Sequence, residues 1–259
     1  FCYTFQYMPG KTTYLDTPVL PIAAMTGPGR FPLDCEYGEA TPMVKSVTNN
    51  DGQGPWARTR IGTGDATSDQ TLTITAMGAV QVPNPAWGAP GEPKTIMRNY
   101  GFGPDTGART AKIVSGSNSW PLEITTWSDG EIVAAIPRGA RSGQLVITRG
   151  DNGQSTVDAI TITVSTTPPL EVGPTKPYQT IQAAIDDAPA AALITVGPGN
   201  YSELPIMYKP IQLQGWGPGV TFINAVKSPA EKIQGWRAKI NELLDANQFS
   251  LLPGQAAPV

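Results

Sequence analysis

The chain contains no histidine among its 259 residues. Histidine is the commonest general base, and it activates the nucleophile in serine–histidine and cysteine–histidine pairs. Its absence excludes those pairs and histidine-ligated metal sites, and leaves any catalysis to carboxylates, lysine, arginine or tyrosine. Two cysteines are too few thiols to complete a zinc site without imidazole. We therefore expect no metal site and no cofactor.

Charged side chains are also scarce. Asp, Glu, Lys and Arg make up 15% of the residues, and the formal net charge is −3. The basic residues are scattered and form no stripe, so an electrostatic grip on nucleic acid is not expected. No apolar run approaches the roughly 18 residues that a membrane-spanning helix needs. The sequence thus predicts neither a nucleic-acid partner nor a membrane span.

Glycine and proline are abundant, with 28 and 26 residues respectively. Together with apolar residues that alternate along short segments, as at Leu72 and Ile74, they predict many short strands joined by tight turns. Asp129-Gly130 and Asn152-Gly153 are strong turn signals. The chain is long enough for two domains, and the composition predicts a mainly β protein.

Residues 1–40 read as proline-punctuated strands, and we expect them to be the terminal strands of a preceding β domain or a linker. The chain begins at Phe1, so either processing removed the start or this is a piece of a larger protein, which we favour. A Cys2–Cys35 disulfide would close a loop of roughly 30 residues and stabilise by about 3.5–4 kcal/mol. The alternative is two buried thiols in a cytosolic protein; we favour the extracellular disulfide.

Three motifs in the next segment occur in the order of a known family: "YGFGPDTG", "ITTWSDGEIVAAIP" and "SGQLVITRGDNGQST". With them, residues 41–165 resemble the IPT/TIG immunoglobulin-like domains, which implies a β-sandwich. Gly101 and Gly103 suit a sharp turn, and Trp127 and Ile136 are spaced to face one core. The chain departs from the family in a long insertion over 81–94 and in the "NYGFG" sequence.

Residues 166–177 are rich in proline and predict a hinge or spacer. Beyond it, apolar residues recur at helical spacing after a possible N-cap at Thr180, namely Ile181, Ala184, Ile185 and Ala188. The "TIQAAIDDA" helix, the "ITVGPGNYSE" turn and "IQLQGWGPGVTFI" resemble the start of a right-handed parallel β-helix of the pectin-lyase-like superfamily. The resemblance implies that the helix caps the open end of a solenoid. It transfers no catalytic residue to this chain.

A second helix is predicted over 228–247, because Ser228 and Glu231 form a capping box and Pro229 stands at the first helical position. We interpret it as an insertion against the flank of the β-helix; the alternative is a partner-docking helix. Residues 178–259 would then hold the cap, about two coils and this insertion. Two coils are fewer than a solenoid needs, so we expect further coils or a partner chain.

The best candidates for ligand binding are Trp87, in a Pro/Gly loop, and Trp216, in a corner. Aromatic faces stack on sugar rings, and loops often carry functional residues. The other aromatic residues at strand spacing are assigned to the core. One interpretation of Glu203 is an acid–base pair with Asp186 or Asp187. The favoured alternative is a polar residue at a coil corner, so no catalytic residue is assigned.

The leading hypothesis is a non-catalytic segment of a large secreted or cell-surface bacterial protein, acting as a spacer, an adhesion module or a carbohydrate-binding scaffold. One alternative is part of a polysaccharide lyase or hydrolase with its active site further along the chain. Another is a subunit of an extracellular assembly. The expected partners are polysaccharide or other copies of the same protein, and the expected location is extracellular or at the cell surface.

Overall fold

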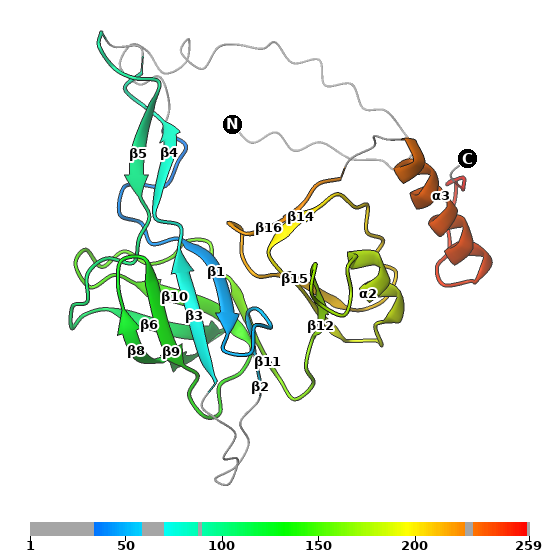
Figure 1. Cartoon of the computed structure of the whole chain (residues 1–259), viewed down its shortest axis with the longest axis horizontal. Coiled ribbons are helices and arrows are strands. Elements are labelled where there is room, and N and C mark those ends of the chain that lie inside the picture. The colour runs from blue at the N-terminus through cyan, green and yellow to red at the C-terminus, as the bar shows by residue number, and fades with distance from the viewer. Residues whose placement is uncertain (1–33, 59–69, 88–89, 226–229, 258–259) are drawn as a thin grey trace.

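The computed structural model of the chain describes residues 34–58, 70–87, 90–225 and 230–257. The protein is mainly β, as the composition predicts, and its strands form two units that lie side by side (Figure 1). Residues 41–165 are called the two-sheet unit, and residues 170–224 the parallel unit. A long helix follows the parallel unit.

The two-sheet unit holds one four-stranded and one five-stranded sheet. The first is antiparallel, in the order β1 (Val44–Asn49), β3 (Thr71–Ala76), β9 (Glu131–Ala135), β8 (Glu123–Trp127). The second has the order β2 (Trp56–Arg58), β11 (Thr161–Ser165), β10 (Gly143–Thr148), β6 (Thr110–Ser115), β7 (Asn118–Pro121). Only its β2–β11 pairing is parallel.

The inward faces of these two sheets share one apolar core. Leu72 and Ile74 of β3 are fully buried, as their alternation predicts. Trp127 and Ile136 belong to the same cluster, which confirms that they face one core. The turns expected at Asp129-Gly130 and Asn152-Gly153 lie between β8 and β9 and between β10 and β11.

A hairpin stands apart from both sheets. Its strands, β4 (Ala79–Pro83) and β5 (Thr95–Asn99), pair only with each other and project from the unit (Figure 1). The segment expected as an insertion, 81–94, therefore supplies part of a paired strand as well as the loop of the hairpin. At the base, Arg98 Nη2 lies 2.6 Å from Asp34 Oδ2, and Arg98 Nη1 donates a 2.8 Å hydrogen bond to Tyr37 O.

The strands of the parallel unit all pair in parallel. One sheet has the order β12 (Leu170–Val172), β13 (Leu193–Val196), β15 (Gln212–Gly215), and the other pairs β14 (Gly199–Tyr201) with β16 (Thr221–Ile223). The chain thus forms one strand of each sheet, β13 and β14, and then adds a parallel neighbour to each in the same order, β15 and β16. The segment expected as a spacer, 166–177, supplies β12 and is part of this unit.

Helix α2 (Ile181–Asp187) begins as the sequence predicts. The Thr180 side chain accepts a hydrogen bond from Ala183 N, which confirms it as the N-cap. Ile181, Ala184 and Ile185 are buried against β12 and β13, so the predicted apolar face is confirmed. Burial of this face fixes the helix on the parallel unit.

Helix α3 (Ala230–Asp245) lies on the side of the parallel unit away from the two-sheet unit (Figure 1). Its Lys239 Nζ is 3.1 Å from Asp186 Oδ2, and Lys232 Nζ donates a hydrogen bond to Ser202 O. The helix therefore packs on the parallel unit. The predicted capping residues Ser228 and Pro229 lie outside the described residues.

Candidate functional site

The outer face of the parallel unit's three-stranded sheet is turned toward the two-sheet unit. Strand register aligns Glu171 of β12, Thr195 of β13 and Gln214 of β15 in one row across this sheet. Thr195 is only 1% exposed, although it is a polar residue on the outside of its own unit. The middle of the row is therefore buried in a junction between the two units, and Glu171 and Gln214 are half-buried at its ends.

One end of the row is tied to the loop between β1 and β2. Glu171 Oε1 accepts a 3.2 Å hydrogen bond from Gln53 Nε2, and Glu171 Oε2 lies 2.5 Å from Lys176 Nζ. Lys176 Nζ also donates a 2.7 Å hydrogen bond to Gly52 O. The proline-rich segment is thus held to the two-sheet unit by two hydrogen bonds, and the ion pair inside the segment joins the two side chains that make them.

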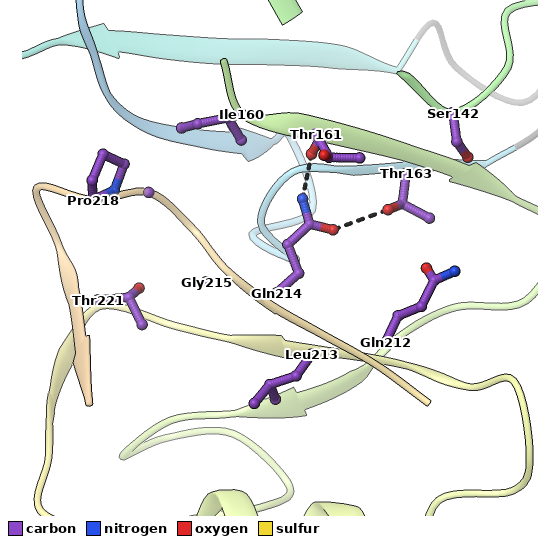
Figure 2. A pocket seen from close by; sticks show the side chains of 11 residues that line it. Ser142, Ile160, Thr161, Thr163, Gln212, Leu213, Gln214, Gly215, Pro218 and Thr221 are labelled. Atoms are coloured by element: carbon purple, nitrogen blue, oxygen red, sulfur yellow. Dashed lines mark hydrogen bonds between the residues drawn. The ribbon is translucent and has the colours of Figure 1, made fainter. Parts of the chain in front are cut away.

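The other end of the row is tied to β11. Gln214 Oε1 accepts a 2.9 Å hydrogen bond from Thr163 Oγ1, while Gln214 Nε2 donates to Thr161 O (Figure 2). Both polar atoms of one side-chain amide are satisfied by the same strand of the other unit. Such two-point contacts fix orientation as well as distance.

Main-chain contacts close the junction. Val47 N donates a 2.8 Å hydrogen bond to Trp216 O, and Gly219 N donates a 3.1 Å bond to Lys45 O. The indole of Trp216 packs so closely on Gly54 that a Cβ there would stand 2.5 Å from the indole nitrogen. Glycine is required at this position by the contact itself.

Two adjoining hollows lie along this junction, with volumes of about 700 and 470 Å³. Ser142, Thr163 and Gln212 line both, so they form one continuous groove, called here the junction groove. Ser142 and Thr163 come from the two-sheet unit, and Gln212 faces them from β15 (Figure 2). The groove is therefore shared between the units.

The walls of the junction groove are polar without charge. No residue that lines either hollow carries an ionisable side chain. Apolar surface comes from residues such as Leu213, Pro218 and Leu170. Gln212 has no side-chain hydrogen bond to any residue that the structure describes, so its amide offers two donors and an acceptor. The groove can accordingly meet a neutral, hydroxyl-rich ligand with hydrogen bonds and apolar contact.

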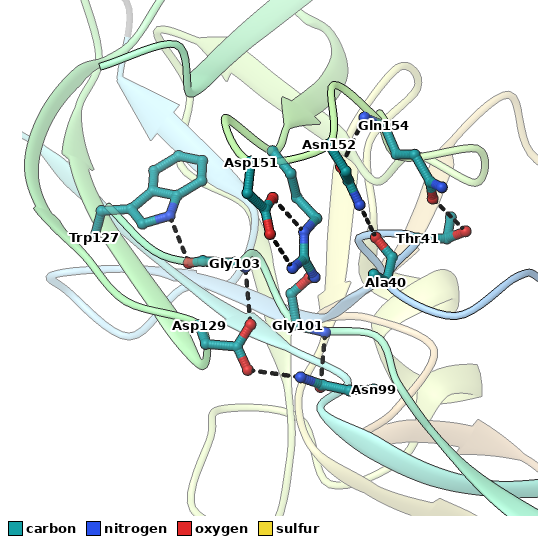
Figure 3. A network of polar contacts seen from close by, with 11 residues as sticks. Ala40, Thr41, Asn99, Gly101, Gly103, Trp127, Asp129, Asp151, Asn152 and Gln154 are labelled. Atoms are coloured by element: carbon teal, nitrogen blue, oxygen red, sulfur yellow. Dashed lines mark hydrogen bonds and ion pairs between the residues drawn. The ribbon is translucent and has the colours of Figure 1, made fainter. Parts of the chain in front are cut away.

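A second polar cluster lies inside the two-sheet unit, where the three quoted motifs meet (Figure 3). Asp129 accepts hydrogen bonds from Gly103 N at 2.8 Å and from Asn99 Nδ2 at 3.0 Å. Trp127 Nε1 donates to Gly103 O at 3.1 Å. A Cβ at Gly101 would stand 2.1 Å from Asp129 Oδ1, so the turn needs glycine there. This cluster holds a backbone turn in place.

Arg149 joins the same cluster to the following loop. Its guanidinium donates to both Asp151 carboxylate oxygens, at 3.0 and 2.7 Å, and to Gly101 O at 3.0 Å (Figure 3). The hydrogen bonds from Arg149 hold the pKa of Asp151 below its usual range, and the same contact raises the pKa of Arg149. The Asp129 carboxylate, the Trp127 indole and the Arg149 guanidinium all bond to groups inside the unit, so the cluster is structural.

The structure separates the two predicted ligand-binding tryptophans. Trp87 is 49% exposed near the tip of the β4–β5 hairpin, with Lys94 Nζ 5.6 Å from its ring centroid. Trp216 is half-buried in the junction, where Lys176 Nζ lies 6.0 Å from its ring centroid. Of the two tryptophans, Trp87 is the more exposed. Sequence reasoning missed Ser142 and Gln212, because nothing local marks a groove between distant segments.

Glu203 has a clear role beside helix α2. Its carboxylate accepts hydrogen bonds from Ile181 N at 2.9 Å and Gln182 N at 3.2 Å. Asp186, one of the two residues considered as an acid–base partner, is held by Gln182 and Lys239. Glu203 therefore stabilises the start of the helix, where a negative charge is favoured.

The remaining expectations concern cysteine and metal. Cys35 is exposed, and its expected partner Cys2 lies outside the described residues, so the disulfide stays a prediction. Within the described ranges, no three metal-ligating side chains gather as a site, and no helix is long and apolar enough to cross a membrane. No family model, curated protein or solved structure matches the chain.

Proposed function

We propose that this chain is a rigid, non-catalytic scaffold segment of a large secreted or cell-surface protein, and that its junction groove binds a neutral polysaccharide. The two-sheet unit would be an IPT/TIG-like sandwich, and the parallel unit the first coils of a pectin-lyase-like β-helix. The single observation that carries the proposal is the junction, which joins the units at several points and shapes the groove between them.

The sandwich assignment is supported by topology and by the motif cluster. Two mostly antiparallel sheets enclose one core, the arrangement of immunoglobulin-like domains. The three motifs that carry the family resemblance meet around Asp129 and Arg149. The motifs lie far apart in the sequence but share one hydrogen-bond network, which is what motifs that define a single domain are expected to do.

The β-helix assignment is supported by the parallel pairings and by the position of α2. Strands β13 and β14 are followed by β15 and β16 in the same two sheets. Helix α2 contacts β12 and β13, at the beginning of this repeat, and buries Ile181 and Ile185 there. A helix in that place protects apolar surface that no preceding coil would cover.

Rigidity follows from the number and type of the junction contacts. Spacer segments made only of proline-rich coil leave their domains free to reorient. Here the segment 166–177 contains a paired strand, and Lys176 reaches across to the other unit. A ligand that contacts both Ser142 and Gln212 would meet walls held at a fixed separation, which lowers the entropy cost of binding.

The class of ligand follows from the lining. A charged ligand would lose its hydration in the junction groove without gaining a counter-ion. A neutral sugar chain would exchange hydrogen bonds with Ser142, Thr163 and Gln212, and pack its apolar faces on the prolines and leucines. The combined size of two adjoining hollows, about 700 and 470 Å³, favours an oligosaccharide over a single ring.

Binding is tested by titrating the chain with neutral cellohexaose and, separately, with acidic oligogalacturonate in a calorimeter. We expect saturable binding of a neutral oligomer that changes little between low and high salt, and that Gln212→Ala weakens. Gln81→Ala, an exposed glutamine of β4 remote from the groove, is the matched control. Binding of only the acidic oligomer, or equal effects of the two substitutions, would overturn the proposal.

A second candidate function, a subunit of an extracellular assembly, is favoured by apolar side chains on the parallel unit. Met207, Phe222 and Ile223 are 51%, 45% and 43% exposed, and the last two belong to the edge strand β16. Exposed edges of this kind invite pairing with another chain. Light scattering over a concentration series tests it: growth of the scattering mass supports assembly, and a constant monomer mass contradicts it.

A further inference from the structure

A small pocket lies between α3 and the parallel unit, on the side away from the junction groove. Its volume is about 240 Å³. Leu204 and Ile206 form one wall, and Trp236 of α3 forms another. This volume is below the roughly 300 Å³ at which pockets for drug-sized ligands begin, so it suits one ring.

Gly235 lines this pocket and is itself exposed. A Cβ built at this helical position would have no neighbouring atom within 4 Å, so the space beside it is empty. Glycine is among the poorest helix formers, and alanine would serve the helix better. The residue thus leaves room beside the Trp236 indole.

One polar group at the rim of the pocket still has hydrogen-bond donors to offer a ligand. The Glu203 carboxylate is bound to the first amides of α2, and Lys239 lies between Asp186 and Glu242, at 3.1 and 2.9 Å. Among the residues that the structure describes, Lys232 Nζ has only a main-chain partner, Ser202 O. An ammonium group has three donors, so Lys232 retains donors for an acceptor at the rim.

We propose that this pocket binds an aromatic carboxylate, with the ring against Leu204, Ile206 and Trp236 and the carboxylate on Lys232. An aromatic ring suits apolar walls and stacks on or meets the edge of an indole. A carboxylate forms a charge-assisted hydrogen bond with the lysine. The same chemistry occurs in a free aromatic acid and in the C-terminal aromatic residue of a peptide. The proposal is independent of polysaccharide binding, because no residue is shared with the junction groove.

The test compares an acid with its neutral amide on the whole chain. Phenylacetate and phenylacetamide are titrated while amide signals are followed by two-dimensional NMR. We expect saturable shifts around α3, with phenylacetate binding about tenfold more tightly, the effect of one charge-assisted hydrogen bond. High salt should narrow this preference. Equal affinity for the acid and the amide would overturn the proposal, as would absence of saturable binding.

Variants locate the binding. Gly235→Leu should fill the pocket and abolish binding of both compounds without lowering the melting temperature, because leucine favours the helix. Lys232→Gln should remove only the preference for the acid, and Lys94→Gln, at a remote exposed lysine, should leave it unchanged. Unaltered binding in Gly235→Leu would contradict the site.

Two further ligands distinguish the source of the carboxylate. A peptide terminus is supported as the ligand if N-acetyl-glycyl-phenylalanine binds more tightly than phenylacetate and if this advantage is lost when the peptide carries a C-terminal amide. Phenylacetate binding more tightly than the peptide acid would support a free aromatic acid. Failure of both acids to bind would reject the proposal and leave polysaccharide binding in the junction groove unaffected.

Discussion

Gly217→Ala should loosen the junction without disturbing either core. Gly217 follows Trp216 and lies against β1, where an added Cβ would stand 2.3 Å from Lys45 O and 2.7 Å from Ser46 Cα. Real Cβ atoms do not approach main-chain atoms so closely, and backbone cannot move aside as a flexible side chain can. The two segments must therefore separate.

The magnitude has two sources. Overpacking a tight contact costs about 1–3 kcal/mol. Separation also weakens the hydrogen bonds from Val47 N to Trp216 O and from Gly219 N to Lys45 O, each worth about 0.5–1.5 kcal/mol. Together these place the loss of free energy of association between the units at about 2–6 kcal/mol.

The assay is denaturant unfolding followed by separate signals from each unit. We expect the wild-type protein to unfold in one transition, whereas in Gly217→Ala the parallel unit unfolds first and the two-sheet unit keeps its midpoint. Gly107→Ala is the matched control, because its new Cβ would meet nothing within 4 Å. A Gly217→Ala protein with a single transition at the wild-type midpoint would refute the reasoning.

Three further predictions follow. Trp216→Ala should lower the free energy of unfolding by about 1–3 kcal/mol, because the indole is half-buried. Trp87→Ala, at an exposed residue, should change it by less than about 0.5 kcal/mol, and equal effects of the two substitutions in chemical denaturation would contradict this. Glu203→Gln should cost about 1–2 kcal/mol by the same measurement, because a charge at the start of α2 is lost; an unchanged midpoint would count against that role. Asp151→Asn should unfold at a lower temperature at neutral pH. Arg149 lowers the folded pKa of Asp151, so their contact stabilises the folded protein above the ordinary pKa of about 4, and this stabilisation is lost as pH falls through the folded pKa. The difference in melting temperature between the wild-type protein and Asp151→Asn should therefore disappear on acidification. A difference that does not depend on pH would contradict this prediction.

Local signals were sufficient where neighbours in sequence decide the structure. The N-cap at Thr180 and the apolar face of α2 were predicted because capping and helical spacing involve residues within two turns. The core position of Trp127 was also predicted, since alternation along a strand fixes which face is inward.

Features set by distant partners were not predictable in the same way. Prolines around 83–93 obscured the strand β4, which exists because β5 pairs with it. Likewise, β12 lies in a segment whose composition is typical of a spacer, and only pairing with β13 makes it a strand. Amino-acid composition indicates the local preference of a segment, but it does not identify the strand with which that segment pairs.

The candidate sites show the same limit. Trp216 was identified as a ligand-binding residue, but its ring packs on Gly54, more than 100 residues earlier in the chain. Glu203 binds the start of a helix that precedes it by about 20 residues. Ser142 and Gln212 meet only once both units have folded and docked.

The central claim is that the two units form one rigid body, and residual dipolar couplings measured by NMR test it most directly. If the junction holds, one alignment tensor will fit the amides of residues 41–165 and 170–224 together. Two tensors of different magnitude and orientation would mean that the units reorient independently, and would contradict the account.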